Sequence, residues 1–235
     1  MLVTITIDGQ LIHVERDTPI LEAARKLGIH IPTLCYHEAL KPYGSCRICM
    51  VEVIKNRRSR LVTSCNYPAE EGLEVLTSTS RVKRTRQMVM ELLLARCPNA
   101  PVIRQMAEKM GIKKVSLKKK EDERCILCGL CVRACDEMVG VRAIGFANRG
   151  AERQVNTPFQ TESDVCIGCG ACTYICPSGC IEMVESPNAQ GGRRLHMGDL
   201  HLDICPNNYE CETCEIEGQF FVEMRRVVDS MRHQK

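Results

Sequence analysis

Two cysteine runs with the same spacing constrain this chain more than any other feature. Residues 125–135 read CILCGLCVRAC and residues 166–177 read CIGCGACTYICP, so both runs have the pattern C-x2-C-x2-C-x3-C. A cysteine that only fills a core needs no fixed distance from the next one, so the repeated spacing indicates thiolate ligation of metal. The pattern, with the proline that follows Cys176, is typical of a pair of [4Fe-4S] sites.

The ligand sets follow from a rule for such paired runs, in which the fourth cysteine of one run ligates the cluster of the other. We expect one [4Fe-4S] cluster on Cys125, Cys128, Cys131 and Cys176, and another on Cys166, Cys169, Cys172 and Cys135. Cys180 has no place in this scheme, and we interpret it as a small buried apolar residue rather than a ligand.

The seventeen cysteines could instead indicate disulfides in a secreted protein. The first residues, MLVTITIDGQ, lack the basic and then apolar segments of a signal peptide, and no apolar run is as long as a membrane span. An odd number of cysteines also favours metal ligation in a reducing compartment. We therefore expect a cytoplasmic protein without a membrane span.

The formal net charge of +3 is no argument for nucleic-acid binding. It assumes neutral thiols, whereas an oxidised cluster with its four thiolates carries about −2. With its clusters bound, the protein would be acidic overall. We expect no nucleic-acid partner.

The N-terminal segment predicts a β-hairpin followed by a helix. Residues 2–7 alternate in polarity, Asp8-Gly9 is typical of a type I′ turn, and apolar residues resume at 11–14. A short helix is expected from Pro19, capped by Asp17 or Thr18 and ending near Gly28. Strand, strand and helix in this order are the start of a β-grasp domain.

Four further cysteines follow this helix with the spacing C-x10-C-x2-C-x15-C. They are Cys35, Cys46, Cys49 and Cys65. A loop that supplies three thiolates and a later strand that supplies the fourth are typical of a [2Fe-2S] site. The alternative is a zinc site, although zinc usually takes two C-x2-C pairs. Strands are expected at 50–54 and 61–63, and a helix over 77–96 capped by one of the residues 77–80.

The order of these motifs resembles a known family. A β-grasp segment, PTLCYH, GSCRICMVEV and a fourth cysteine about sixteen residues later are similar to the N-terminal part of the large iron-sulfur subunit of respiratory complex I. The chain resembles even more the shorter relatives of that subunit in NAD-reducing and electron-bifurcating hydrogenases and in NAD-linked formate dehydrogenases. The resemblance covers roughly residues 1–185.

The sequence departs from this family after the helix at 77–96. The family continues with His-Pro and a His-x3-Cys-x2-Cys-x5-Cys site for one more [4Fe-4S] cluster, whereas this chain has Cys97-Pro98 and no cysteines directly after it. The C-terminal cysteines Cys205, Cys211 and Cys214 offer three thiolates for a relocated cluster, with Cys97 or His201 as the fourth ligand. A Cys3His zinc site that includes His201 is the alternative.

The resemblance implies an electron-transfer subunit of an NAD(P)-linked oxidoreductase complex. The chain has no dinucleotide, phosphate-loop or flavin motif of its own, so we expect the nucleotide and flavin to bind to another subunit. The implied partners are a flavin- and NAD(P)-binding iron-sulfur subunit, a thioredoxin-like [2Fe-2S] subunit, and a hydrogenase or formate dehydrogenase module. Two alternatives remain at this point: a stand-alone polyferredoxin that carries electrons by diffusion, and a zinc-binding interaction protein.

The expected architecture is an α+β chain with four parts. Residues 1–78 form the β-grasp [2Fe-2S] domain and 79–120 a helical linker. Residues 121–185 form a two-[4Fe-4S] ferredoxin-like domain. Residues 186–235 form a metal-binding tail that ends in a docking helix at 219–231.

Overall fold

The structure is a computed structural model that describes residues 1–112, 115, 117, 123–160, 163, 165–185, 193–197 and 200–202. The chain divides into two compact units. The first contains Met1–Tyr36 and Lys41–Cys128, and the second contains His37–Leu40 and the described residues from Gly129 onward. The predicted docking helix at 219–231 lies outside the described residues.

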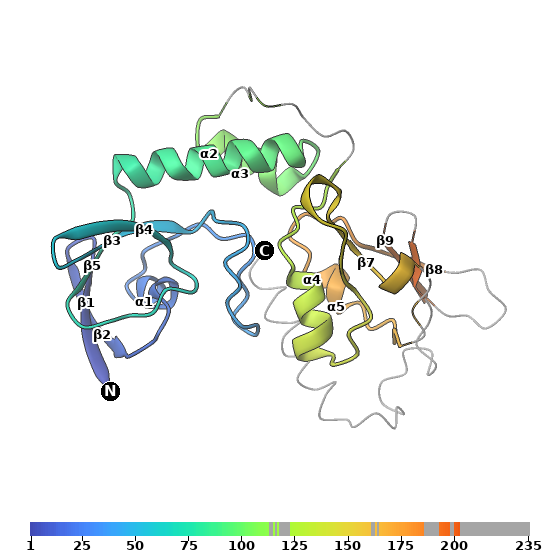
Figure 1. The fold of residues 1–235 in the computed structure, drawn as a ribbon, viewed down its shortest axis with the longest axis horizontal. Helices are drawn as coiled ribbons and strands as arrows, with labels where there is room; N and C mark the ends of the chain where they lie inside the picture. Colours follow the sequence, from blue (N-terminus) through green and yellow to red (C-terminus); the bar gives the residue numbers. More distant parts are fainter. Residues whose placement is uncertain are drawn as a thin grey trace. The chain divides into compact units, whose positions relative to one another are not determined.

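The first unit is built on a five-stranded mixed sheet (Figure 1). Its elements in chain order are β1 (Leu2–Ile7), β2 (Gln10–Glu15), α1 (Ile20–Lys26), β3 (Met50–Lys55), β4 (Arg58–Thr63) and β5 (Leu73–Leu76). The strand order is β2-β1-β5-β3-β4, in which β1 and β5 are parallel and the other pairs are antiparallel. The predicted hairpin and the strands at 50–54 and 61–63 are confirmed, whereas β5 was not predicted from the sequence.

The turn between β1 and β2 has the predicted type I′ character. Asp8 and Gly9 have φ values of 47° and 81°, and this turn requires positive φ at both central residues. The register pairs Ile7 with Gln10 directly across the turn. The local sequence therefore fixes this hairpin.

The predicted side-chain cap of α1 is wrong. Neither Asp17 nor Thr18 caps the helix, because its first amide groups donate to backbone carbonyls from a distant segment. The amide of Ile20 donates to the carbonyl of Tyr67 at 3.0 Å, and the amide of Leu21 donates to that of Ser64, also at 3.0 Å. Tertiary contacts thus satisfy donors that a side-chain cap would otherwise serve.

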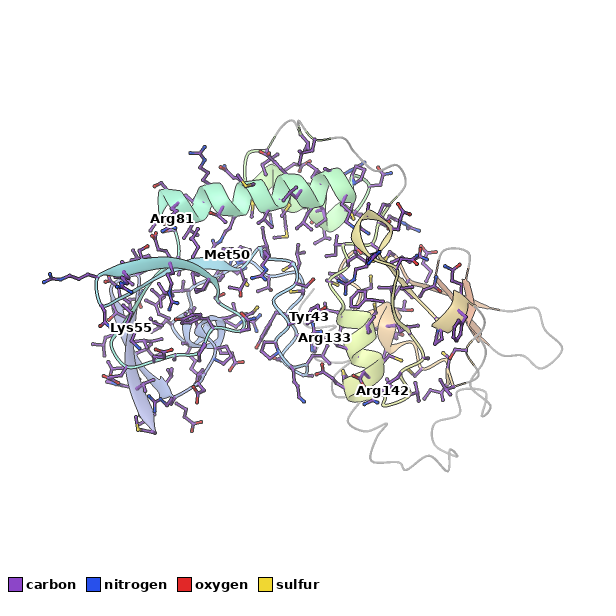
Figure 2. The ribbon with its side chains drawn as sticks, in the orientation of Figure 1. Tyr43, Met50, Lys55, Arg81, Arg133 and Arg142 are labelled. Atoms are coloured by element: carbon purple, nitrogen blue, oxygen red, sulfur yellow. The ribbon has the colours of Figure 1, made fainter. Side chains whose placement is uncertain are left out.

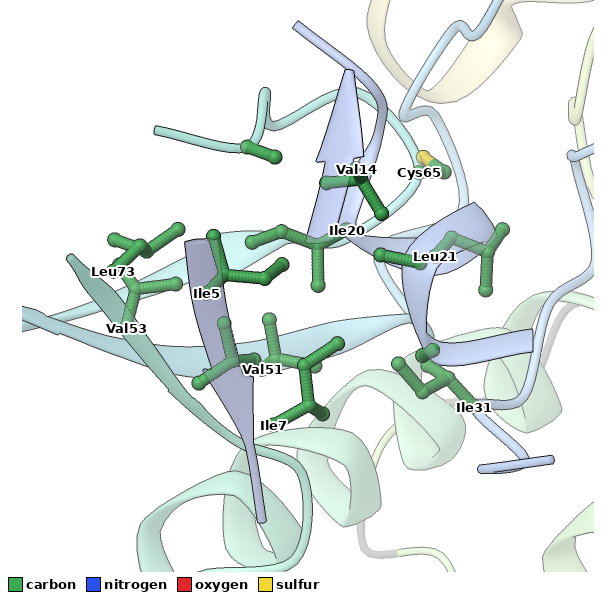
Figure 3. Packing of buried hydrophobic residues seen from close by; sticks show 14 of the residues in the cluster. Ile5, Ile7, Val14, Ile20, Leu21, Ile31, Val51, Val53, Cys65 and Leu73 are labelled. Carbon is green, nitrogen blue, oxygen red and sulfur yellow. The ribbon is translucent and has the colours of Figure 1, made fainter. Parts of the chain in front are cut away.

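The core of the first unit lies between the sheet and α1 (Figure 3). Ile5, Ile7, Val51 and Val53 from the strands, with Leu21 from α1, are at most 1% exposed. The cysteines Cys49 and Cys65 belong to the same buried cluster of side chains. One edge of the candidate [2Fe-2S] site is therefore part of the hydrophobic core.

Two helices follow the sheet in the first unit, namely α2 (Ser80–Arg96) and α3 (Pro101–Lys109). Thr79 caps α2, because its hydroxyl oxygen accepts a hydrogen bond from the amide of Val82 at 3.2 Å. This confirms the cap predicted within residues 77–80. Helix α2 packs against β3 and α3.

The second unit contains short elements around the two cysteine runs. They are α4 (Leu130–Arg133), a π-helical turn (Ala134–Met138), β6 (Gly145–Ala147), a 3-10 turn (Gly150–Glu152), β7 (Gln154–Asn156), a second 3-10 turn (Pro158–Gln160), α5 (Ala171–Tyr174), β8 (Glu182–Glu185), β9 (Arg193–Met197) and β10 (Leu200–Leu202). Strands β6 and β7 form an antiparallel pair, and β10-β9-β8 form a separate antiparallel sheet. Throughout the described part of the chain, no helix is both long and apolar enough to cross a membrane.

Candidate iron-sulfur sites

The first candidate site gathers the four N-terminal cysteines at one end of the five-stranded sheet. Cys35 lies in the loop after α1, Cys46 and Cys49 lie in the loop before β3, and Cys65 follows β4. All four are buried, with at most 6% of each side chain exposed. Hydrogen bonds join the sulfurs in two pairs, Cys35 with Cys46 and Cys49 with Cys65. This two-by-two arrangement fits a [2Fe-2S] group, which takes two thiolates on each iron.

The loop that carries Cys46 is held tightly by its backbone. The amide of Cys46 donates to the sulfur of Cys35 at an N–Sγ distance of 3.3 Å. Gly44 has a φ of +70°, and a Cβ atom at this position would lie 2.8 Å from Nδ2 of Asn66. Amide donors to ligand sulfurs tune a cluster, and a glycine is required where the backbone turns this closely.

The hydrogen bonds between paired sulfurs shift the pKa values of their thiols. The hydrogen bond from Cys65 lowers the pKa of the Cys49 thiol to about 6, despite the opposing effect of burial. The same contact, with burial, raises the pKa of Cys65, and the contact with Cys35 raises that of Cys46. A metal that binds here must displace these shared protons, because the ligand form of cysteine is the thiolate.

The alternative of a zinc site at these four cysteines loses support. Zinc requires four ligand atoms around a single centre. The pairing of the four sulfurs, two by two, fits the two irons of a [2Fe-2S] group better than a single zinc centre.

The two cysteine runs repeat in backbone conformation as well as in sequence. Leu127 and Gly168 occupy the same position of their runs and have φ values of 51° and 64°. Gly129 and Gly170, the residues before α4 and α5, have φ values of 74° and 76°. In each run, a residue with left-handed backbone conformation lies directly before and directly after the second cysteine. These two residues make the chain turn sharply at that cysteine. Leu127 adopts at a cost the conformation that Gly168 adopts freely.

The second candidate site is a cavity within the second unit. It is lined by Cys135 from the π-helical turn and by all three leading cysteines of the later run, Cys166, Cys169 and Cys172. The remaining lining is apolar: Val139, Val141, Ala143, Ile144, Ile167 and Ala171. Burial raises the pKa of Cys169 to about 11 and that of Cys172 to about 12. These four thiols around one apolar cavity fit the ligand set of a [4Fe-4S] group.

Cys135 is oriented by its neighbours. The amide of Ala143 donates to the Cys135 sulfur at 3.2 Å, and the amide of Arg142 donates to its carbonyl oxygen at 3.3 Å. The residue sits in a π-helical turn, a rare conformation that occurs often at functional sites. Local structure therefore turns the last cysteine of the first run toward the cavity of the second.

The other four cysteines of the two runs are divided between the units. Cys125 and Cys128 lie in the first unit, and Cys131 and Cys176 lie in the second. Their common ligation of one cluster stays a prediction. Cys180 is half-buried, and its sulfur lies 3.4 Å from that of Cys176; its interpretation as an apolar residue rather than a ligand stays a prediction.

Helix α2 holds the start of the first run through residues that the motif did not reveal. Nε of Arg96 donates to the carbonyl oxygen of Cys125 at 3.2 Å, and the amide of Cys125 donates to Oε1 of Glu123 at 3.1 Å. A guanidinium nitrogen of Arg96 also lies 3.7 Å from Glu123. Both residues are ordinary charged side chains in the sequence, so no local signal could have identified them.

The third predicted site is described only in part. Cys97 follows α2, is fully buried, and its thiol donates to the carbonyl oxygen of Cys125. His201 lies in β10, where the register places it opposite His196 of β9. Cys205, Cys211 and Cys214 lie outside the described residues.

Comparisons with known families identify both cluster domains. Residues 1–80 match a 2Fe-2S iron-sulfur cluster binding domain, and residues 119–183 match a 4Fe-4S dicluster domain. The chain therefore combines one [2Fe-2S] domain with a domain for two [4Fe-4S] clusters. The expected α+β organisation and these three cofactors are confirmed at this level.

Similar proteins are subunits of NAD(P)-linked oxidoreductases. The chain is 35% identical to the NADPH-Fe(3+) oxidoreductase subunit alpha of Geobacter sulfurreducens over 92% of its own length. It is 34% identical to an NADH-quinone oxidoreductase subunit of Rhizobium meliloti over 88% of its length. It spans only 28% and 26% of the length of these relatives.

A similar solved structure is that of an NAD+-reducing [NiFe]-hydrogenase in the H2-reduced state. The TM-score is 0.58 and the sequence identity is 29%, and the match covers 66% of this chain and 74% of the hydrogenase chain. This similarity agrees with the family that the sequence motifs indicated.

Proposed function

We propose that this chain is an iron-sulfur electron-transfer subunit of an NAD(P)-linked oxidoreductase complex. The observation that carries the proposal is the succession of a [2Fe-2S] domain and a 4Fe-4S dicluster domain in one chain, at residues 1–80 and 119–183. The relatives that match this chain are oxidoreductase subunits by name. The domain limits that we propose are 1–78, 79–120, 121–185 and 186–235.

The ligand sets are part of the proposal. For the [2Fe-2S] site they are Cys35, Cys46, Cys49 and Cys65, supported by the paired, buried sulfurs. For one [4Fe-4S] site they are Cys135, Cys166, Cys169 and Cys172, supported by their shared cavity. For the other they are Cys125, Cys128, Cys131 and Cys176, supported by the repeated spacing.

An iron-sulfur cluster whose irons are fully ligated by protein moves single electrons and offers no open position to a substrate. The residues of this chain hold such groups and keep water away from them. Val139, Val141 and Ile144 supply the apolar wall of the second site. Amide donors to Cys35 and Cys135 stabilise negative charge on the ligand sulfurs.

The partners that we propose are a flavin- and NAD(P)-binding iron-sulfur subunit, a thioredoxin-like [2Fe-2S] subunit, and a hydrogenase or formate dehydrogenase module, all in the cytoplasm. The similarity to an NAD+-reducing hydrogenase chain favours the hydrogenase module. Purification of the complex from its native source tests this. Partners that remain in stoichiometric amounts support the subunit role, whereas a monomeric chain would indicate a diffusible polyferredoxin.

A third metal site remains part of the proposal. Cys205, Cys211 and Cys214 with Cys97 would hold a further [4Fe-4S] cluster, and His201 is the alternative fourth ligand or a zinc ligand. The Geobacter relative supports a shared tail, because a match over 92% of this chain extends beyond residue 183.

The electron-transfer role predicts the effect of removing one cluster from the assembled complex. Cys172→Ser should stop NAD(P)H-linked electron flow through the complex and leave dye reduction by the flavoprotein intact. Tyr174→Phe is the control, because it changes an exposed residue of the same helix that we do not assign as a ligand. Unchanged flow in the Cys172 variant would refute the relay.

A further inference from the structure

Arg86 is a charged residue in an unusual environment for a cation. It lies on α2 and is half-buried, and its Nε donates to the carbonyl oxygen of Met50 at 2.9 Å. One of its terminal nitrogens, Nη2, is buried and has no hydrogen-bond acceptor among the described residues. A buried cation without an acceptor is costly unless negative charge lies close by.

The contact with Met50 places this guanidinium beside the [2Fe-2S] ligands. Met50 directly follows Cys49 in the chain, and it lies where α2 packs against β3 (Figure 2). The carbonyl oxygen of Cys49 is itself fixed by two hydrogen bonds from Ser64, of 3.1 Å from the amide and 2.9 Å from the hydroxyl. The hydrogen bond to Met50 therefore holds Arg86 at the residue that follows one ligand of the site, and Ser64 fixes the backbone of that ligand.

The electrostatics agree with this placement. Burial lowers the pKa of the Arg86 guanidinium, and the charges of Cys49 and Asp8 oppose the shift. Asp8 keeps its negative charge while both of its carboxylate oxygens accept hydrogen bonds from Thr77. Of these two groups, Cys49 has the larger electrostatic effect on Arg86.

We propose that Arg86 supplies the counter-charge of the [2Fe-2S] site and thereby raises its reduction potential. A [2Fe-2S] group with four thiolates carries about −2 when oxidised and gains one negative charge on reduction. A fixed cation nearby therefore stabilises the reduced form more than the oxidised form. The inference rests on the proposal that Cys35, Cys46, Cys49 and Cys65 hold this group.

The test is a redox titration of the purified full-length chain, in which electron paramagnetic resonance follows the reduced [2Fe-2S] signal. Arg86→Gln removes the charge, Arg86→Lys keeps it, and Arg84→Gln removes a charge from an exposed position of the same helix. We expect Arg86→Gln to lower the ratio of reduced to oxidised cluster about tenfold at a fixed potential, equivalent to about 59 mV. Arg86→Lys and Arg84→Gln should titrate close to the unmodified chain.

The outcomes separate this inference from the assignment beneath it. An unmodified chain without a [2Fe-2S] signal would refute the ligand set itself. A signal whose potential is the same in Arg86→Gln would refute the role of Arg86 alone. If Arg86→Gln does not retain the cluster at all, a cluster retained in Arg86→Lys supports the role of the positive charge. A cluster lost from both variants shows that Arg86 acts through packing and overturns the inference.

Discussion

The thiol of Cys97 donates a hydrogen bond to the backbone carbonyl oxygen of Cys125, at an Sγ–O distance of 3.1 Å. The contact joins the end of α2 to the first cysteine of the double run. Arg96 donates to the same carbonyl oxygen, so two consecutive residues hold this segment. This hydrogen bond needs the thiol proton, which Cys97 would lose as a cluster ligand, so the structural role and the ligand role that we propose exclude each other.

Cys97→Ser separates these two roles, because a serine hydroxyl can donate the same hydrogen bond but is not the thiolate that iron-sulfur clusters use. The chain with a third [4Fe-4S] cluster contains about fourteen irons, and without it about ten. If Cys97 is the fourth ligand, iron analysis should show a fall of about four irons in Cys97→Ser and in the reference variant Cys211→Ser.

A different pattern would change the assignment of this site. Loss of iron in Cys211→Ser alone points to His201 as the fourth ligand. About ten irons in the unmodified chain, with or without one zinc, refutes the third cluster.

The crossed ligation of the two [4Fe-4S] clusters predicts which variants resemble each other. Cys135 lines a cavity with Cys172, although it belongs to the other run. Cys135→Ser and Cys172→Ser should therefore abolish the same [4Fe-4S] resonance in the reduced chain, and Cys125→Ser should abolish the other one. Ligation within each run would instead make Cys135→Ser resemble Cys125→Ser.

Gly44→Ala should destabilise the first unit more than Gly9→Ala does. Both glycines have left-handed φ values, +70° and +81°, so alanine costs about 1 kcal/mol at either position. Only at Gly44 would the new Cβ meet another atom, Nδ2 of Asn66 at 2.8 Å. Asn66 cannot easily move away, because its Oδ1 accepts a hydrogen bond from Thr63 at 2.5 Å.

Urea unfolding of the full chain measures this difference. Gly44→Ala should show the lower midpoint, and a second change, Asn66→Ala, should restore part of the loss. Equal midpoints for the two glycine variants would mean that the loop relaxes around the new methyl group.

Thr79→Ala should destabilise α2 by about 1 kcal/mol, the usual cost of removing a side-chain cap. The hydroxyl of Thr79 accepts from the amide of Val82 and donates to Glu52 at 2.8 Å, so it also ties the helix to β3. Thr79→Ser should retain most of the stability. Thr85→Ala is the control within the same helix, since its hydroxyl only donates to the carbonyl of Arg81. Comparable losses at both threonines in thermal unfolding would contradict the capping role.

The cluster types could be predicted because ligand spacing is a local property of the sequence. Two runs of C-x2-C-x2-C-x3-C specify paired [4Fe-4S] sites whatever the fold of the rest of the chain, since the irons of a cluster need thiolates at set distances from one another. The type I′ turn at Asp8-Gly9 is equally local, because only its two central residues decide it. Arg86 carried no such signal and looked like one more arginine of a basic helix.

By itself, the sequence determined the kinds of metal group, the cysteines available for them and the hairpin that begins the fold. Only the tertiary structure decided that β5 runs parallel to β1, that carbonyls at Ser64 and Tyr67 receive the first amides of α1, and that Arg86 bonds to the residue after Cys49. These features join residues far apart in the chain. Their free energy depends on which surfaces meet when the core forms, and no short segment of sequence encodes that.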